Sequence, residues 1–282
     1  MADTMAKGEN DMTNESILTQ NKNSWNAIAD RAFAWTALPA YGCLCPTEDD
    51  LHLFPDLTEK KVLDIGCGSG HSLQWCGEHG AGELWGLDIS ENQLASAKKV
   101  LMENGYAPHL FCSPMERNPG IPQGYFDVVY AIYAIGWTVD LQATFDLIAS
   151  YLKPGGTFIF SWDHPFMHCV ETASQMAQGI EAKPGDHDAY HETADERLIF
   201  SGCYYEAKPF EFAKVGNPLT LHNRRLSDYI NALAQSGFAV EHMVEEADKE
   251  TLARACEFSS QFYSAYKAKH FPLSLIVKAR KL

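Results

Sequence analysis

The sequence lacks several features that would assign it to a specialised class of protein. No run of apolar residues approaches the roughly 18 that a membrane-spanning helix requires, so we expect no membrane insertion. The first 23 residues are polar and have no apolar segment typical of a secretory signal. The eight cysteines form no CxxC pair, which excludes zinc ribbons and dithiol redox motifs of the usual spacing. We therefore expect a cytoplasmic protein with reduced thiols.

Basic residues are also scarce. Lysine and arginine number 22 against 37 aspartates and glutamates, which leaves a net charge of −15 with neutral histidines. A surface of this charge repels a phosphate backbone, so we expect no nucleic-acid partner. The 282 residues, 46% of them hydrophobic, are enough for one large core with an elaboration. The sequence pattern specifies no oligomeric state.

From residue 61 onward, apolar strand patterns alternate with amphipathic helix patterns. Such alternation predicts an α/β fold, a doubly wound, seven-stranded, mostly parallel sheet. Ser90 and Gln93 match the N-cap and N3 positions of a capping box, which predicts a helix from residue 91 that stops at Gly105. The predicted strands are 62–65, 83–87, 109–112, 126–132, 157–162, 238–244 and 273–277.

The remaining segments interrupt this alternation and divide the chain. We expect a disordered tail over 1–23 and a helical N-terminal cap over 24–58. The core would comprise 59–165 and 223–282, and the polar, aromatic stretch 166–222 would be an inserted lid over the carboxyl ends of the strands.

A glycine-rich turn is the strongest functional signal. The first predicted strand runs into Gly66, Gly68 and Gly70 at alternate positions and then into a helix. Glycine is needed where the backbone takes positive φ or touches a ligand closely, and the helix start offers free N–H groups. Asp88 ends the next strand 22 residues after Gly66, at the place where an acid binds a ribose diol.

Two cofactor classes use such a turn. The dinucleotide pattern is G-x-G-x-x-G, but here His71 occupies the third glycine position. Asp64, two residues before Gly66, would repel a pyrophosphate but could hold an ammonium group directly or through water. The turn therefore favours a nucleoside that carries an amino acid over NAD.

Four segments carry a family resemblance. VLDIGCGSG, GLDIS, YFDVVYAIYAI and LKPGGTFIFS occur in that order, and the chain resembles class I S-adenosylmethionine-dependent methyltransferases over 61–163 and 226–280. More narrowly it resembles the small-molecule type related to quinone-biosynthesis methyltransferases. The resemblance implies a Rossmann-like methyltransferase fold, S-adenosyl-L-methionine as cofactor, and methyl transfer to a small acceptor by in-line displacement.

The resemblance also implies roles for individual residues. Gly66, Gly68 and the backbone near Cys67 would lie against the methionine part, and Asp88 would hold the ribose hydroxyls. The other implied cofactor contacts are Ile89 against adenine, Met115 and Glu116 at the adenine edge, and the carbonyl of Ala131 on the amino group. The family often has an aspartate after the third strand; here Cys112-Ser113-Pro114 stands instead, and Ser113 is the candidate replacement.

The acceptor side is less specific. Trp25, Tyr133, Trp137 and Trp162 are placed by the family layout near the carboxyl edge, where each is either an acceptor contact or part of the core. His164 and His222 could deprotonate an acceptor, or could be hydrogen-bonded structural residues.

The end of the fourth strand narrows the acceptor class. Tyr130-Ala131-Ile132-Tyr133 lacks both the Asn/Asp-Pro-Pro-Tyr/Phe of amide and exocyclic-amine methyltransferases and the acidic metal ligand of catechol-type enzymes. We therefore expect no metal, and a small, apolar or aromatic acceptor. A non-catalytic S-adenosylmethionine sensor and an NAD(P)-dependent oxidoreductase remain the alternatives.

Overall fold

The computed structural model describes residues 12–34, 36–173, 176, 196–206, 208–253 and 263–282. Its centre is a seven-stranded sheet. The strands are β1 (Lys61–Ile65), β2 (Glu83–Asp88), β3 (His109–Cys112), β4 (Phe126–Ala131), β5 (Leu152–Asp163), β10 (Phe238–Val244) and β11 (Ser274–Lys281).

The strand order confirms the predicted doubly wound fold. It is β3-β2-β1-β4-β5-β11-β10, with parallel pairing from β3 to β5 and antiparallel pairing of β11 with both β5 and β10. Parallel strands joined by helical crossovers end at the same edge of a sheet. The carboxyl ends of β1, β2 and β4, and the loops that follow them, therefore meet at one edge.

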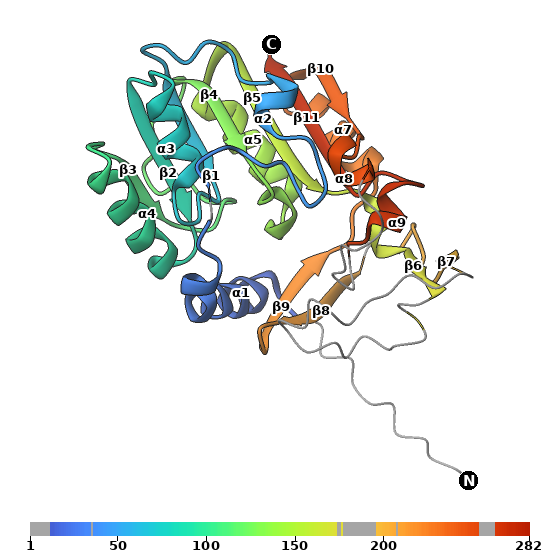
Figure 1. Cartoon of the computed structure of the whole chain (residues 1–282). Helices are drawn as coiled ribbons and strands as arrows, with labels where there is room; N and C mark the ends of the chain where they lie inside the picture. The colour runs from blue at the N-terminus through green and yellow to red at the C-terminus, as the bar shows by residue number, and fades with distance from the viewer. Residues whose placement is uncertain (1–11, 35, 174–175, 177–195, 207, 254–262) are drawn as a thin grey trace.

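Helices cover both faces of the sheet (Figure 1). Leu63 and Ile65 of β1 belong to a cluster with α5 (Leu141–Tyr151) and α7 (Leu226–Gln235), and Val62 belongs to a cluster with α3 (His71–Glu78) and α4 (Glu91–Glu103). These three β1 side chains are at most 1% exposed. Burial on both faces is what an interior parallel strand requires.

Shorter helical segments connect these layers. They are η1 (Ala29–Arg31), α2 (Glu48–Leu51), η2 (Ile135–Trp137), η3 (Pro165–His168), α8 (Lys249–Ala253) and α9 (Ala265–Ala268).

The predicted disordered tail over 1–23 is wrong for its second half. Residues 14–23 belong to α1 (Asn14–Ile28), whose N-terminus is capped by Thr13: its Oγ1 accepts from Ser16 N at 3.2 Å. The helix buries one stripe, Ile17, Asn21, Ser24 and Ile28. Two of these four residues are polar, so apolar periodicity does not predict the part of the helix before residue 24. Residues 1–11 lie outside the described residues.

The predicted lid contains two antiparallel strand pairs in its described part. β6 (Val170–Thr172) pairs with β7 (Leu198–Phe200), and β8 (Pro209–Lys214) pairs with β9 (Asn217–His222). Residues 174–175, 177–195 and 207 of that segment lie outside the described residues. Figure 1 shows α1 beside the β8–β9 hairpin, at a distance from the sheet. From here on, we use the name cap for α1 together with this hairpin, in place of the predicted N-terminal cap over 24–58.

Asn21 holds the cap together. Its Nδ2 donates to the carbonyl of Thr220 at 2.9 Å, and the Thr220 N–H donates to Asn21 Oδ1 at 2.8 Å. We expect Asn21→Ala to lower the free energy of unfolding by about 2 kcal/mol, because it leaves two buried backbone groups of β9 without partners. Urea denaturation measures the loss, and hydrogen exchange at Thr220 localises it. The exposed neighbour Asn23→Ala is the control; equal effects of the two substitutions would contradict this role for Asn21.

Candidate active site

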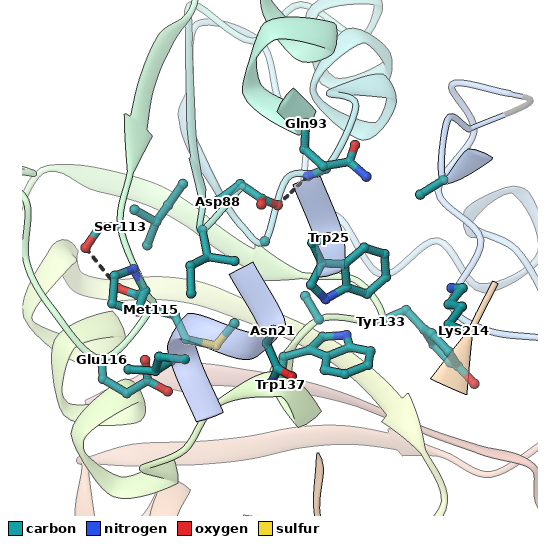
Figure 2. Close-up of a pocket in the computed structure, with 18 residues that line it drawn as sticks. Asn21, Trp25, Asp88, Gln93, Ser113, Met115, Glu116, Tyr133, Trp137 and Lys214 are labelled. Atoms are coloured by element: carbon teal, nitrogen blue, oxygen red, sulfur yellow. Dashed lines mark hydrogen bonds between the residues drawn. The ribbon is translucent and has the colours of Figure 1, made fainter. Parts of the chain in front are cut away.

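A cavity lies at the carboxyl edge of the sheet, beneath the cap (Figure 2). Its walls come from α1, η2, the glycine turn after β1, the end of β2, the start of α4, the loops after β3 and β4, and the last residue of β8. This edge is where ligands bind in open parallel α/β sheets.

Backbone hydrogen bonds fix the glycine turn to the neighbouring strand. The N–H groups of Gly66 and Cys67 both donate to the carbonyl of Leu87, at 2.7 and 3.0 Å. The Cys67 side chain is buried, and its Sγ lies close to Gly86 of β2. Cys67 therefore contributes its backbone to the turn, while its thiol is part of the core; it is not among the described residues that line the cavity, and its contact with the methionine part stays a prediction.

The glycines of the turn serve different purposes. A Cβ on Gly66 would lie 2.5 Å from the Cβ of Ala134, so Gly66 permits close packing with the loop after β4. Gly68 has φ +49°, and the nearest atom to an added Cβ would be Gln93 Oε1 at 3.8 Å. Both glycines line the cavity, but only Gly68 borders open space within it. Gly68 is the position where the absent side chain leaves room for a ligand.

Asp88 connects the glycine turn to the start of α4. Its Oδ2 accepts from Gly68 N at 2.9 Å and its Oδ1 accepts from Ser90 N at 2.8 Å. Burial raises the pKa of Asp88, and the N–H groups oppose that shift. Each oxygen keeps a lone pair for a ligand in the cavity, which Asp88 and its neighbour Ile89 both line.

Gln93 was missed as a site residue. The prediction of Ser90 as N-cap is confirmed, since its Oγ accepts from Gln93 N at 3.1 Å. The other half of the predicted capping box does not form, because the Ser90 N–H already donates to Asp88. The buried Gln93 amide instead lines the cavity, and its Oε1 has no hydrogen-bond partner among the described residues.

Residues 113–116 form the opposite wall of the cavity from Tyr133 and Lys214 (Figure 2). Ser113 Oγ donates to the Pro114 carbonyl at 3.1 Å, so the hydroxyl proton is used locally. Glu116 Oε1 accepts from Val139 N at 2.6 Å, whereas its Oε2 is buried with no partner in the described part of the chain. Met115 completes this wall.

Aromatic side chains line the other end of the cavity. Trp25 and Trp137 meet edge to face, with centroids 5.2 Å apart and planes at 88°. Tyr133 lies beside them. Trp162 is 5% exposed and does not line the cavity; it packs beneath Tyr133 and Trp137 with centroids 5.3 and 5.5 Å away. Of the two alternatives for Trp162, this packing supports the one that makes it part of the core.

A buried polar cluster holds Tyr133. Its backbone has φ +53°, a strained conformation for a residue with a side chain, and its N–H donates to Ser161 Oγ at 3.0 Å. Its hydroxyl donates to Asp163 Oδ1, which also accepts from the Tyr263 hydroxyl at 2.9 Å. Burial raises the pKa of Asp163 to about 6. Neither Asp163 nor Tyr263 was predicted from the sequence.

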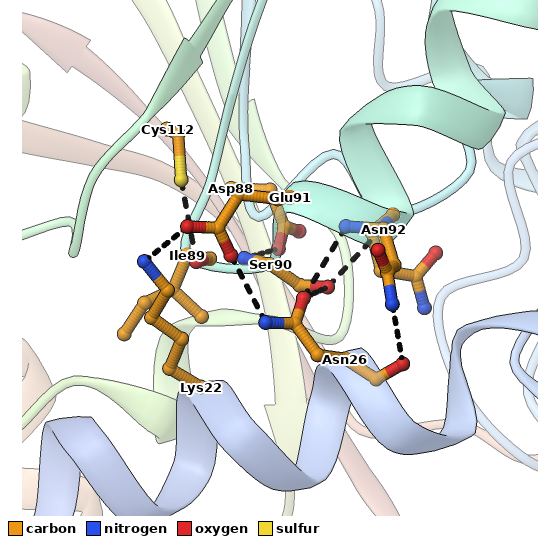
Figure 3. A network of polar contacts seen from close by, with 9 residues as sticks. Lys22, Asn26, Asp88, Ile89, Ser90, Glu91, Asn92 and Cys112 are labelled. Carbon is orange, nitrogen blue, oxygen red and sulfur yellow. Dashed lines mark hydrogen bonds and ion pairs between the residues drawn. The ribbon is translucent and has the colours of Figure 1, made fainter.

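A second polar network joins α1 to the start of α4 (Figure 3). Asn26 Oδ1 accepts from Ser90 Oγ at 2.6 Å, and Lys22 Nζ lies 2.5 Å from Glu91 Oε1. These contacts join α1 to the first turn of α4. They place Trp25 over the end of β2, which the sequence alone did not predict.

The two predicted catalytic histidines are not among the described residues that line the cavity. His164 is 3% exposed, its Nε2 lies 2.9 Å from Glu245 Oε1, and its Nδ1 accepts from Phe166 N at 3.2 Å. Both ring nitrogens are thus engaged in the protein, which supports a structural role. His222 ends β9; burial and the charge of Arg224 lower its pKa. A role for His222 stays a prediction.

Two predicted cofactor contacts also lie behind the cavity wall. Asp64 is 3% exposed; burial raises its pKa well above the usual range, the charge of Asp88 adds to this, and the Tyr130 hydroxyl opposes it. Ala131 is fully buried at the end of β4, and Ala134 reaches the cavity in its place. Their contacts with an amino group stay predictions.

Two further features are absent from the described residues, a metal-binding group and a membrane-spanning helix. No three His, Cys, Asp or Glu side chains among them are grouped to hold a metal ion. No helix among them has both the length and the apolar character needed to cross a membrane.

Comparisons with known proteins agree with this geometry. A family model described as a methyltransferase domain matches residues 44–242. An uncharacterized protein of Haemophilus influenzae is 28% identical over 235 residues, 82% of this chain and 85% of that protein. A ubiquinone biosynthesis O-methyltransferase of Azoarcus sp. is 33% identical over 105 residues, which covers 37% of this chain and less than half, 45%, of that enzyme.

A solved structure resembles the whole fold. The S-adenosylmethionine dependent methyltransferase from Mesorhizobium loti superimposes with a TM-score of 0.63 at 26% identity, covering 82% of this chain and 95% of that one.

Proposed function

Because this chain belongs to the methyltransferase domain family and uses S-adenosylmethionine, we propose that it methylates a small, apolar or aromatic acceptor bound against Trp25, Tyr133 and Trp137. The observation that carries this proposal is the continuity of one cavity. Its one end has the glycine turn and Asp88, and its other end has aromatic walls. Cofactor and acceptor would therefore share a single cavity.

The residues present fit S-adenosylmethionine. Two residues that line the cavity, Gln93 and Glu116, each carry a buried side-chain oxygen without a partner among the described residues, and a Cβ added at Gly68 would meet no atom closer than 3.8 Å. The cofactor offers matching donors in its ribose hydroxyls and two amino groups. We assign the ribose hydroxyls to Asp88, the adenine amino group to Glu116, and a further hydroxyl or the ammonium group to Gln93.

When bound, the cofactor supplies an electrophilic methyl group for in-line displacement. The contribution of the protein is positioning, because the nucleophile has to be held about 3 Å from that carbon and aligned with it. Trp25 and Trp137 can do this by enclosing a flat or apolar acceptor, and Trp162 and the Asp163 cluster hold the walls in place. Walls of this kind would also limit the access of water to the reacting groups.

Two measurements test this function in order. Calorimetric titration with S-adenosylmethionine, S-adenosylhomocysteine, NAD and NADP should show micromolar binding of the first two only. Formation of S-adenosylhomocysteine is then measured with a panel of phenols, aromatic acids and apolar alcohols. Acceptor-dependent turnover supports the proposal. Cofactor binding with turnover only on protein or RNA would overturn the small-molecule assignment.

A further inference from the structure

Lys214 is the cation among the described residues that line the cavity. It is the last residue of β8, and its Nζ lies 4.9 Å from the centroid of the Trp25 ring. Figure 2 shows it at the Tyr133 end of the cavity, on the opposite side from Glu116. Its side chain is exposed to solvent in part, while its ammonium lies over the Trp25 ring.

Within the described part of the chain, no carboxylate lies within ion-pair distance of the Lys214 ammonium. Its contact with Trp25 is a cation–π interaction, which stabilises the ammonium by about 0.5–1 kcal/mol and leaves its N–H donors free for a hydrogen-bonding anion.

Asp163 is the acid that attracts Lys214. Its oxygens, however, are engaged by other residues. Oδ1 accepts from the hydroxyls of Tyr133 and Tyr263, and Oδ2 lies 3.9 Å from His168 Nε2. Asp163 thus lowers the cost of placing a cation here without forming a salt bridge with it.

The surrounding protein lowers the pKa of Lys214, and Asp163 opposes that shift. A charged group in this position is stabilised by a ligand of opposite charge, because a pair in a partly dehydrated site interacts more strongly than one in water. The two acids at the other end of the cavity do not pair with Lys214. Asp88 accepts from the N–H of Gly68, and Glu116 accepts from the N–H of Val139.

We propose that Lys214 binds an anionic group of the acceptor, a carboxylate, so that the substrate is a small apolar or aromatic acid. This rests on the proposed function and specifies its substrate class. The ring or chain of the acid lies against Trp25 and Trp137, and its carboxylate faces Lys214. The neighbouring Trp–Trp pair and the ammonium together select an acid over its neutral analogue.

The test compares acids with their amides on protein saturated with S-adenosylhomocysteine. The pairs are benzoate and benzamide, 3-phenylpropionate and 3-phenylpropanamide, and indole-3-acetate and indole-3-acetamide, titrated by calorimetry. The wild type should bind at least one acid roughly 10-fold or more tightly than its amide. Lys214→Met should remove the preference and Lys214→Arg should keep most of it.

Lys208→Met is the control, because Lys208 lies on the same segment but is exposed and pairs with Glu206 on the surface. It should keep the preference. Equal binding of every acid and its amide by the wild type, or an unchanged preference in Lys214→Met, would overturn the proposal.

A second arm distinguishes the cofactor carboxylate from that of the acceptor. Affinity for S-adenosylhomocysteine should be unchanged in Lys214→Met; a loss of that affinity without an acid preference would assign Lys214 to the cofactor and contradict our proposal. Turnover separates this proposal from the function it rests on. Neutral acceptors methylated with the same KM by wild type and Lys214→Met would refute the acid assignment while leaving the small-molecule methyltransferase intact.

Discussion

Asp88→Ala should weaken the binding of S-adenosylmethionine at least 100-fold. The carboxylate is the charged acceptor at the ribose position, and it also holds the Gly68 N–H at 2.9 Å, so its removal takes away both a ligand contact and the anchor of the turn. Two hydrogen bonds to a charged group are together worth about 3 kcal/mol, which corresponds to roughly a 100-fold change in dissociation constant. Calorimetric titration of the variant measures this change.

A matched carboxylate at the other edge of the sheet separates binding from folding. Asp127 Oδ2 accepts from the backbone N–H of Lys61 at 3.0 Å, and its Oδ1 pairs with Lys153 at 2.7 Å. Asp127→Ala should therefore lose stability without losing cofactor affinity. Circular dichroism establishes that both variants are folded at the titration temperature. Wild-type affinity in folded Asp88→Ala would contradict the assignment of the ribose contact.

The cofactor end of the site could be predicted from the sequence because its signals are local. Three alternating glycines follow one strand directly, and an acid ends the next strand 22 residues after Gly66; parallel pairing of the two strands brings these two short signals together. Gly66, Gly68, Asp88, Ile89, Met115 and Glu116 all line the cavity. The order of the strands was predictable for the same reason, since each contains a short apolar run, but β5 and β11 are longer than the predicted 157–162 and 273–277 because their pairing continues over polar residues.

The acceptor end could not be predicted in the same way, because long-range contacts build it. Asp163 and Tyr263 meet although 100 residues separate them. In a strand buried on both faces, such as β5, the sequence does not alternate between apolar and polar residues. It therefore does not show whether Trp162 and its neighbours face the cavity or the core. His164 follows β5, as expected of an acceptor contact. Its Nε2, however, is hydrogen-bonded to Glu245, the residue directly after β10.

The polar residues of α1 show a further limit of sequence patterns. Asn21 is buried because it pairs with both backbone groups of Thr220, and Asn26 is placed by its contacts with the start of α4. Buried polar side chains of this kind look like surface residues in a hydropathy pattern. Gln93 is a similar case: its local role as a capping residue is taken over by Asp88, which frees the amide for the cavity.

Asp163→Asn should make the protein more stable at neutral pH. Burial raises the pKa of Asp163 from 3.8 to about 6, so the folded state binds a proton more tightly than the unfolded state. The stability that this proton provides is complete below the unfolded pKa and is lost as the pH rises through the folded pKa. A shift of this size corresponds to about 3 kcal/mol above pH 6, which the neutral asparagine does not lose.

The substitution keeps the geometry of the cluster. Asparagine retains a carbonyl oxygen that can accept from the hydroxyls of Tyr133 and Tyr263. The other titratable groups that face Asp163 stay in place in both proteins, so the difference between them isolates residue 163. These groups are Cys43, Cys45, His168, Lys214, Tyr229 and Lys267.

Urea denaturation of both proteins between pH 4 and pH 8 measures the effect. The advantage of Asp163→Asn should be about 3 kcal/mol at pH 7 to 8 and should fall towards zero near pH 4. Asp127→Asn provides the control of opposite sign, because Lys153 and the Lys61 N–H lower the pKa of Asp127 against the effect of burial. That variant should be less stable than wild type at pH 7, and the deficit should shrink in acid. An Asp163→Asn protein with lower stability at pH 7 would show that the partners of the carboxylate stabilise it more than burial disfavours it. A pH-independent difference would show that folding does not shift the pKa of Asp163.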